Sequence, residues 1–248
     1  MPASTRDWDS AQLQDRRWRR AVEQLSNPAV PTAQRVKAAR KILRDGSDLA
    51  CCMLFSACRA ADPAGTWGEQ HPFSSVRGAV RFRALRILGR PSKLQGRDHH
   101  VAAQLLPWIA KPRDQVILTR QLETRLSEHE RPALTALARI IDDINDIDEA
   151  LLATISERVR DPDQPSTTHA ALAQVLAAWP DERALTLLRD GAAHPDHVQR
   201  WPYIAALLAR SPEEGRALAT DHRDRLGPHH IHAADVRDAL GASQQRPG

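Results

Sequence analysis

The residues between Ser75 and Lys93 have the types and spacing of an anion-binding surface. This segment, SVRGAVRFRALRILGRPSK, holds five arginines and one lysine and no acidic residue. Arginine forks bind phosphate and carboxylate groups in a bidentate manner. Solvated helices usually mix charges of both signs, because oppositely charged pairs one turn apart stabilise them. We therefore expect a partner to supply the missing negative charge, either an external molecule or the acidic C-terminal half of the chain.

The helical pattern of this segment separates its apolar and basic residues. At about 100° per residue one stripe is apolar, and it contains Val76, Val80, Ala84, Ile87 and Leu88. The arginines fall on its two flanks, with Arg83, Arg86 and Arg90 on one and Arg77 and Arg81 on the other. The pattern predicts an amphipathic helix whose polar side is arginine.

Two other basic segments precede the segment from Ser75 to Lys93. They are RRWRR (16–20) and a predicted helix over 31–46. If equivalent helices stack side by side, their cations merge into one basic strip that suits an acidic protein surface or a phosphate backbone. A plain solvated face is the third interpretation. Two tryptophans, Trp18 and Trp67, are expected near this strip. Their rings either stack on bases of a bound nucleic acid or pack in the protein core. The predicted binding residues are Lys37, Arg40, Lys41, Arg44, Trp67, Arg77, Arg81, Arg83, Arg86, Arg90 and Lys93.

Eleven histidines raise the question of a metal site. They cluster in RDHHV (97–101) and HHIH (229–232), but neighbours in a helix point about 100° apart. Zinc needs three or four convergent ligands, so we expect surface or capping histidines and no metal. The acidic run over 140–150, IIDDINDIDEA, lacks the glycine and the positioned glutamate of a calcium loop. We interpret it as a solvated turn with helix caps, with a cation site or a partner contact as alternatives.

Enzyme motifs are absent from the sequence: there is no HExxH, GxSxG, GxGxxG or phosphate-binding P-loop. We therefore predict no catalytic residue and no cofactor.

No apolar run approaches the roughly 18–20 residues of a membrane span. The first 20 residues have no apolar core of a secretory signal. Three cysteines without CxxC spacing are expected to be buried thiols in a reducing cytoplasm.

Composition favours helices over strands. The 248 residues are 42% hydrophobic but only 4% aromatic, and the apolar content is mostly Ala, Leu, Val and Ile. The net charge of +4 hides a polarity along the chain, because residues 1–124 hold 21 Lys and Arg against 11 Asp and Glu, and residues 125–248 hold 14 against 20. We expect an all-α protein with a single domain over 1–242, basic over 1–124 and acidic over 125–242, and a frayed tail over 243–248.

Helix boundaries are indicated by Pro, Gly, Asp and Thr. Thr32 is placed to cap a helix that Gly46 closes, and Gly89 with Pro91 stops the basic helix. Pro107 should kink or end a helix predicted over 98–111.

The C-terminal helices repeat at a regular interval. DPDQPS (161–166) and HPDHVQ (194–199) lie 33 residues apart, each before a helix rich in Ala and Leu, and WPDERALTLLRDG follows the first of these helices. This pattern, clearest over 147–226 and weaker over 31–90, resembles HEAT-like helical repeats. The resemblance implies an α-α superhelix whose second helices line a concave surface. An irregular multi-helix bundle is the alternative.

Two enzyme groups within the HEAT-like family provide a comparison. Metal-dependent hydroxylases resembling HEAT repeats use repeated His-Glu pairs, whereas SEHERP (127–132) supplies one. HEAT-like alkylpurine DNA glycosylases use an Asp flanked by Trp, and Trp179-Pro180-Asp181 is the nearest match, which we interpret as a helix stop. We predict a cytoplasmic, non-catalytic adaptor that presents a basic surface to an acidic macromolecular partner. The alternative is a nucleic-acid-binding protein using the same strip, with repair glycosylase activity as a variant.

Overall fold

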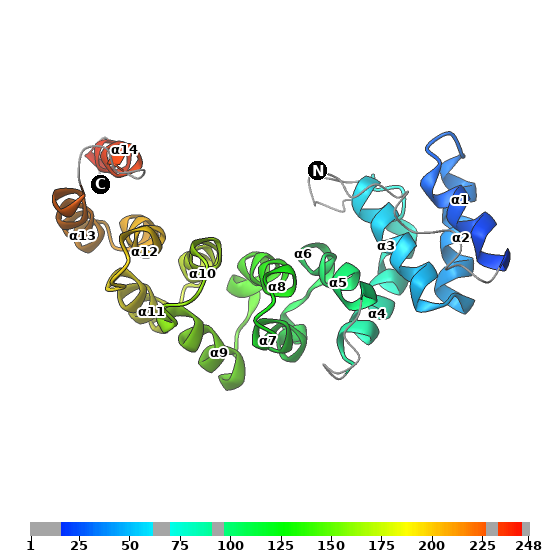
Figure 1. The fold of residues 1–248 in the computed structure, drawn as a ribbon, viewed down its shortest axis with the longest axis horizontal. Helices are drawn as coiled ribbons and strands as arrows, with labels where there is room; N and C mark the ends of the chain where they lie inside the picture. Colours follow the sequence, from blue (N-terminus) through cyan, green and yellow to red (C-terminus); the bar gives the residue numbers. More distant parts are fainter. Residues whose placement is uncertain (1–15, 62–69, 91–96, 227–232, 245–248) are drawn as a thin grey trace. The chain divides into compact units, whose positions relative to one another are not determined.

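The computed structural model describes residues 16–61, 70–90, 97–226 and 233–244, and these residues form an all-helical protein (Figure 1). No strand occurs in these ranges, which confirms the predicted all-α class. No helix within them has the length and apolar character needed to cross a membrane. The chain divides into two compact units, residues 1–110 and residues 111–248. The prediction of one domain over 1–242 stays a prediction.

The first unit is built around one apolar helix, α3 (Asp48–Ala61). Its side chains are buried on nearly all sides, and it packs against α1, α2, α4 and α5. Cys51, Cys52 and Cys58 belong to this core, which confirms that the three thiols are buried. The other helices of the unit are α1 (Arg16–Ser26), α2 (Thr32–Asp45), α4 (Arg77–Leu88), α5 (Arg97–Ala103) and α6 (Leu106–Ile109), with a 3-10 turn, η3 (Ser74–Val76), before α4.

The basic helix α4 ends where its sequence predicts, at Gly89. The whole predicted apolar stripe is buried, and it comprises Val76, Val80, Ala84, Ile87 and Leu88. Gly89 ends the helix, and its N–H donates to the Leu85 carbonyl at 2.9 Å. Pro91 lies outside the described residues.

Two predicted boundaries need correction. Pro31, not Thr32, is the N-cap of α2, because Thr32 already has helical backbone; the predicted C-terminal residue Gly46 is confirmed. The helix predicted over 98–111 is two helices, since α5 stops at Ala103 and Pro107 lies in the first turn of α6. A proline has no N–H to donate, so it is favoured in the first turn, where that N–H would have no intrahelical acceptor.

The second unit contains eight α-helices in the part that is described. They are α7 (Gln115–Glu123), α8 (Ser127–Ile140), α9 (Glu149–Arg160), α10 (Ser166–Ala178), α11 (Glu182–Ala192), α12 (His197–Arg210), α13 (Pro212–Arg225) and α14 (Ala233–Gln244), with 3-10 turns η5 (Pro112–Asp114) and η6 (Ile141–Asp143). The predicted tail is helical as far as Gln244, and residues 245–248 lie outside the description.

Helices of the second unit pack in two rows. Helix α9 contacts α7 and α11, whereas α10 contacts α8 and α12, so alternate helices lie side by side (Figure 1). Helices α11 and α12 approach closely at Gly191, where an added Cβ would lie 2.5 Å from Cγ of Tyr203.

Aspartates begin α9, α11 and α12. The carboxylates of Asp148, Asp181 and Asp196 each accept a hydrogen bond from a backbone N–H of the first turn.

Candidate functional site: a basic groove between α1 and α2

Helix α2 presents four cations on one exposed face. Lys37, Arg40, Lys41 and Arg44 are all exposed, and at 3.6 residues per turn they fall within an arc of about 100°. The opposite face packs inward, because Ala38, Ala39 and Ile42 are buried. The burial of this apolar face is what turns the four cations outward together.

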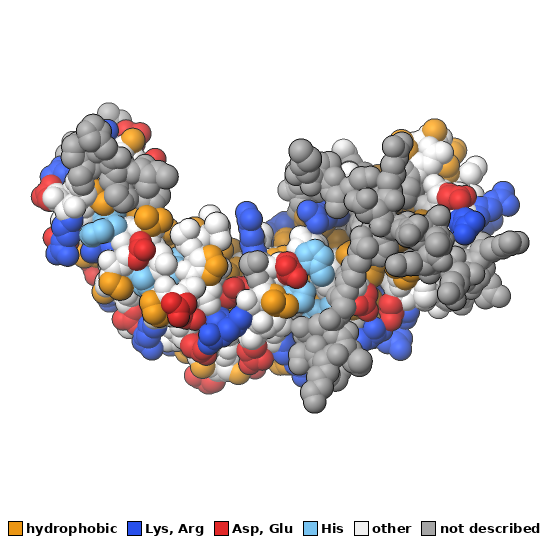
Figure 2. Space-filling view, viewed as in Figure 1, with side chains coloured by type: hydrophobic (Ala, Val, Ile, Leu, Met, Phe, Trp, Pro, Cys, Tyr) orange, Lys and Arg blue, Asp and Glu red, His pale blue; other side chains and the backbone are white. Residues whose placement is uncertain are grey.

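Helix α1 completes a groove with these residues. It packs against α2 and contributes Arg20, Ala21 and Gln24. The groove has a volume of about 910 Å³ and no acidic residue among its described lining. Its described lining is Arg20, Ala21, Gln24, Gln34, Lys37, Ala38, Arg40, Lys41 and Arg44. Figure 2 shows Lys and Arg side chains in the region of α1 and α2. We call this set of residues the basic groove.

Trp18 supports the groove from inside and is not available to a ligand. Its side chain is only 3% exposed. The Lys41 ammonium lies 5.7 Å from the centroid of the Trp18 ring, within the range of a cation–π contact. The alternative of core packing for Trp18 is therefore the one that the structure supports. Trp67, the other tryptophan predicted near the strip, lies outside the described residues.

The arginines of α4 on one flank bind backbone carbonyls of the same unit. Arg77 Nη2 donates to the Trp108 carbonyl at 2.8 Å, and Arg81 Nε donates to the Ile109 carbonyl at 3.0 Å. Both acceptors lie at the C-terminal end of α6, where carbonyls lack intrahelical donors and the helix dipole is negative. These two guanidinium groups therefore cap a short helix.

Two arginines on the other flank, Arg83 and Arg90, bind aspartates of the first unit. Arg83 Nη2 donates to Asp48 Oδ1 at 3.1 Å and to the Gly46 carbonyl at 3.1 Å. Arg90 bridges Asp48 and Asp98, at 2.5 Å and 3.2 Å. The hydrogen bond that Arg90 donates to the Asp48 carboxylate raises the pKa of Arg90. Negative charge for Arg83 and Arg90 thus comes from within the first unit.

The structure therefore divides the predicted binding residues into three groups. Lys37, Arg40, Lys41 and Arg44 meet in the basic groove, with Arg20 added from α1. Arg77, Arg81, Arg83 and Arg90 have intramolecular partners, and Arg86 is exposed. Lys93 lies outside the described residues. The RRWRR segment indicated Arg20, but the sequence did not show which of its arginines faces α2.

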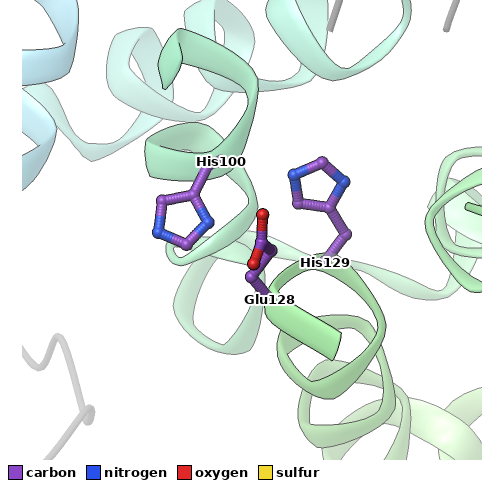
Figure 3. Close-up of side chains that lie close together, drawn as sticks. All are labelled: His100, Glu128 and His129. Atoms are coloured by element: carbon purple, nitrogen blue, oxygen red, sulfur yellow. The ribbon is translucent and has the colours of Figure 1, made fainter. Parts of the chain in front are cut away.

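The His-Glu pair of the second unit lies at the start of α8. Glu130, buried with 2% exposure, pairs with Arg158, whose Nε lies 3.3 Å from Oε1 of the glutamate. Burial raises the pKa of Glu130, and the positive charge of Arg158 opposes this shift. The preceding residues, Glu128 and His129, are drawn with His100 of α5 in Figure 3. His100 belongs to the first unit, so the second unit supplies two of the three, fewer than a zinc site needs.

The tryptophan-flanked aspartate is a helix cap. The Asp181 carboxylate accepts the Arg183 N–H at 2.8 Å and also binds the Arg183 side chain, whose guanidinium lies over Trp179. These hydrogen bonds lower the pKa of Asp181. Trp179 is the C-cap of α10 and Asp181 is the N-cap of α11, so α10 stops at this tripeptide, as predicted, and α11 begins there.

Comparison of the chain with protein-family models, with curated proteins and with solved structures finds no match.

Proposed function

We propose that this protein is a non-catalytic binding protein whose basic groove holds an acidic macromolecular partner. The observation that carries the proposal is the groove itself, where five cations of α1 and α2 meet and the described lining has no carboxylate. Arg20, Lys37 and Arg40 have no ionic partner among the described residues of the chain.

Repulsion between these cations favours binding of an anionic partner. Like charges one turn apart destabilise a helix slightly, and the repulsion is relieved when a partner brings carboxylates or phosphates. Charges at a groove also steer an oppositely charged partner and raise its association rate. The proposed mechanism is therefore surface complementarity on a preformed face.

An acidic protein surface is the preferred partner. Binding of single-stranded nucleic acid usually includes stacking of bases on aromatic rings. Trp18, the aromatic residue beside the groove, is 3% exposed and covered by Lys41. A phosphate backbone bound by the same cations, including the duplex of a HEAT-like DNA glycosylase, remains the alternative that the experiment below addresses.

We further propose that the second unit is a HEAT-like array. Support comes from the contacts of α9 with α7 and α11 and of α10 with α8 and α12. Stacked helix pairs produce such contacts. The aspartates that begin α9 and α11, Asp148 and Asp181, lie 33 residues apart, which is the interval of the sequence repeat.

The test is fluorescence anisotropy with three labelled probes: an oligoglutamate peptide, duplex DNA and single-stranded RNA, each at low and high salt. We expect the peptide to bind at low salt. The Lys37→Glu/Arg40→Glu variant should lose this binding, because both side chains are exposed groove cations. Circular dichroism should show unchanged helicity.

A matched control carries the same change of charge outside the groove. Arg59→Glu/Arg113→Glu reverses two exposed arginines that do not line it, and this variant should retain most of the binding. Equal loss in both variants would show that only net charge matters, and the groove would not be the site. Preferential binding of duplex DNA would replace the acidic-protein partner with the nucleic-acid alternative.

A further inference from the structure

Arg200 of α12 is a buried cation with few partners. Its side chain is 9% exposed, and its Nε is buried with no hydrogen-bond acceptor among the described residues. Its ion pair is long, with Nη2 3.8 Å from Asp221 Oδ2. Buried arginines are normally paired and hydrogen-bonded, because an uncompensated buried charge is costly. The buried guanidinium group of Arg200 therefore lacks a close hydrogen-bond acceptor that a bound anion can supply.

The neighbouring carboxylates are bound mainly by other arginines. Asp221 Oδ1 accepts Arg225 Nε at 3.0 Å, closer than its approach to Arg200. Glu214 binds Arg189 through both oxygens, at 2.8 and 2.9 Å. Burial lowers the pKa of Arg200, and the charge of Arg225 lowers it further while Asp221 opposes the shift. The three arginines Arg189, Arg200 and Arg225 thus share two carboxylates, those of Glu214 and Asp221. One positive charge is left in excess.

These residues surround a pocket between α11, α12 and α13. The pocket has a volume of about 480 Å³, within the range of about 300–1,000 Å³ that is usual for small-molecule sites. Apolar side chains complete its described lining, which consists of Arg189, Ala192, Ala193, Arg200, Glu214, Leu218, Asp221 and Arg225. The combination of a single excess cation and a short apolar wall defines the ligand that would fit.

We propose that this pocket binds a small monoanionic carboxylate with a short aliphatic chain. The carboxylate accepts hydrogen bonds from the Arg200 guanidinium and balances its charge, since arginine and carboxylate fit as a two-pronged pair. The aliphatic part lies against Ala192, Ala193 and Leu218. A monoanion matches the excess of one charge, whereas a phosphate dianion overcompensates it beside Glu214 and Asp221. The site is independent of the basic groove.

The experiment is isothermal titration calorimetry of the full chain with butyrate at constant ionic strength. Acetate tests the contribution of the aliphatic chain, and inorganic phosphate tests the class of anion. We expect butyrate to bind more tightly than acetate and phosphate. Arg200→Gln should weaken butyrate binding by about tenfold or more, because a charge-assisted hydrogen bond is lost.

Three variants keep the result interpretable. Arg223→Gln removes an exposed arginine of α13 that pairs with Asp224 and does not line the pocket, so it should bind butyrate normally. Ala193→Phe obstructs the exposed edge of the pocket without changing a charge and should weaken binding even if Arg200→Gln folds poorly. Lys37→Glu/Arg40→Glu should leave butyrate binding unchanged. Three results would each overturn the proposal. They are no binding of butyrate, butyrate binding by both Arg200→Gln and Ala193→Phe as tight as by the unmodified protein, and tighter binding of phosphate than of butyrate.

Discussion

Arg90 Nη2 lies 2.5 Å from Asp48 Oδ2, and this ion pair joins residues 42 positions apart in the chain. Asp48 also accepts a hydrogen bond from Arg83, so one carboxylate in the first turn of α3 holds two arginines of the basic stretch. A high density of arginines in one segment is therefore no measure of the charge offered to a partner. Lys37 and Arg40 of α2, which have no ionic partner among the described residues, are the better candidates.

The first prediction compares two arginines of α4. Arg83→Ala should lower the free energy of unfolding by about 1–2 kcal/mol, because it removes hydrogen bonds to the Asp48 carboxylate and the Gly46 carbonyl. Arg86→Ala, at an exposed position of the same helix, should change it by less than about 0.5 kcal/mol. Urea unfolding monitored by circular dichroism measures both values. Equal stability of the two variants would contradict a structural role for Arg83.

The second prediction concerns two glycines in helices. At Gly215 an added Cβ would lie 2.4 Å from the Leu208 backbone nitrogen, whereas at Gly78 it meets nothing within 4 Å. Gly215→Ala should destabilise the protein by about 1–3 kcal/mol through steric overlap of α12 and α13. Gly78→Ala should stabilise it by roughly 0.5–1 kcal/mol, since alanine favours the helix. Thermal unfolding of both variants should show midpoint shifts of opposite sign.

The third prediction is a loss of stability in mild acid. Burial lowers the pKa of His169 below its usual value of 6.5, and the neighbouring His194 lowers it further. The unfolded chain therefore binds this proton more readily than the folded chain, so the free energy of unfolding should fall as the pH drops below about 6.5. His99 acts in the same direction, again because it is buried.

Urea unfolding at pH 7.5, 6.5 and 5.5 measures this dependence. His169→Gln should show a smaller loss of stability between pH 6.5 and 5.5 than the unmodified protein. An identical pH profile for the two proteins would argue against a neutral buried imidazole at position 169.

The fourth prediction is salt sensitivity of binding at the basic groove. Its cations are exposed, so their attraction for an acidic partner is screened at a distance of about 8–10 Å at physiological salt. Affinity for oligoglutamate should fall steeply as salt rises from low to physiological concentration, and the slope should be smaller for Lys37→Glu/Arg40→Glu. An affinity that does not change with salt would mean that the peptide is held by apolar contacts elsewhere.

The fifth prediction concerns the three thiols. Burial raises the pKa values of Cys51, Cys52 and Cys58, and all three side chains lie in the core of the first unit. Because the thiolate is the reactive form, a thiol reagent at pH 8 should modify them slowly in the folded protein and rapidly in urea. Rapid modification of a thiol without denaturant would show that the core around α3 opens readily.

The sequence by itself determined the helical class, the apolar stripe of α4 and several helix ends. These are local properties: the 3.6-residue period fixes which side chains share a face, and Gly46 and Gly89 end helices through contacts within one turn. The common face of Lys37, Arg40, Lys41 and Arg44 is a local property too, because it depends only on their spacing in one helix.

Only the tertiary structure decided which arginines are engaged. The partners of Arg83 and Arg90 on α3 lie 35 and 42 residues away, and the carbonyls that bind Arg77 and Arg81 become acceptors only because α6 ends beside α4. The burial of Arg200 could not be predicted either, since nothing in the α12 sequence HVQRWPYIAALLAR distinguishes a buried arginine from a solvated one. Periodicity fixes the direction of a side chain from its own helix, but its partners depend on how distant helices pack.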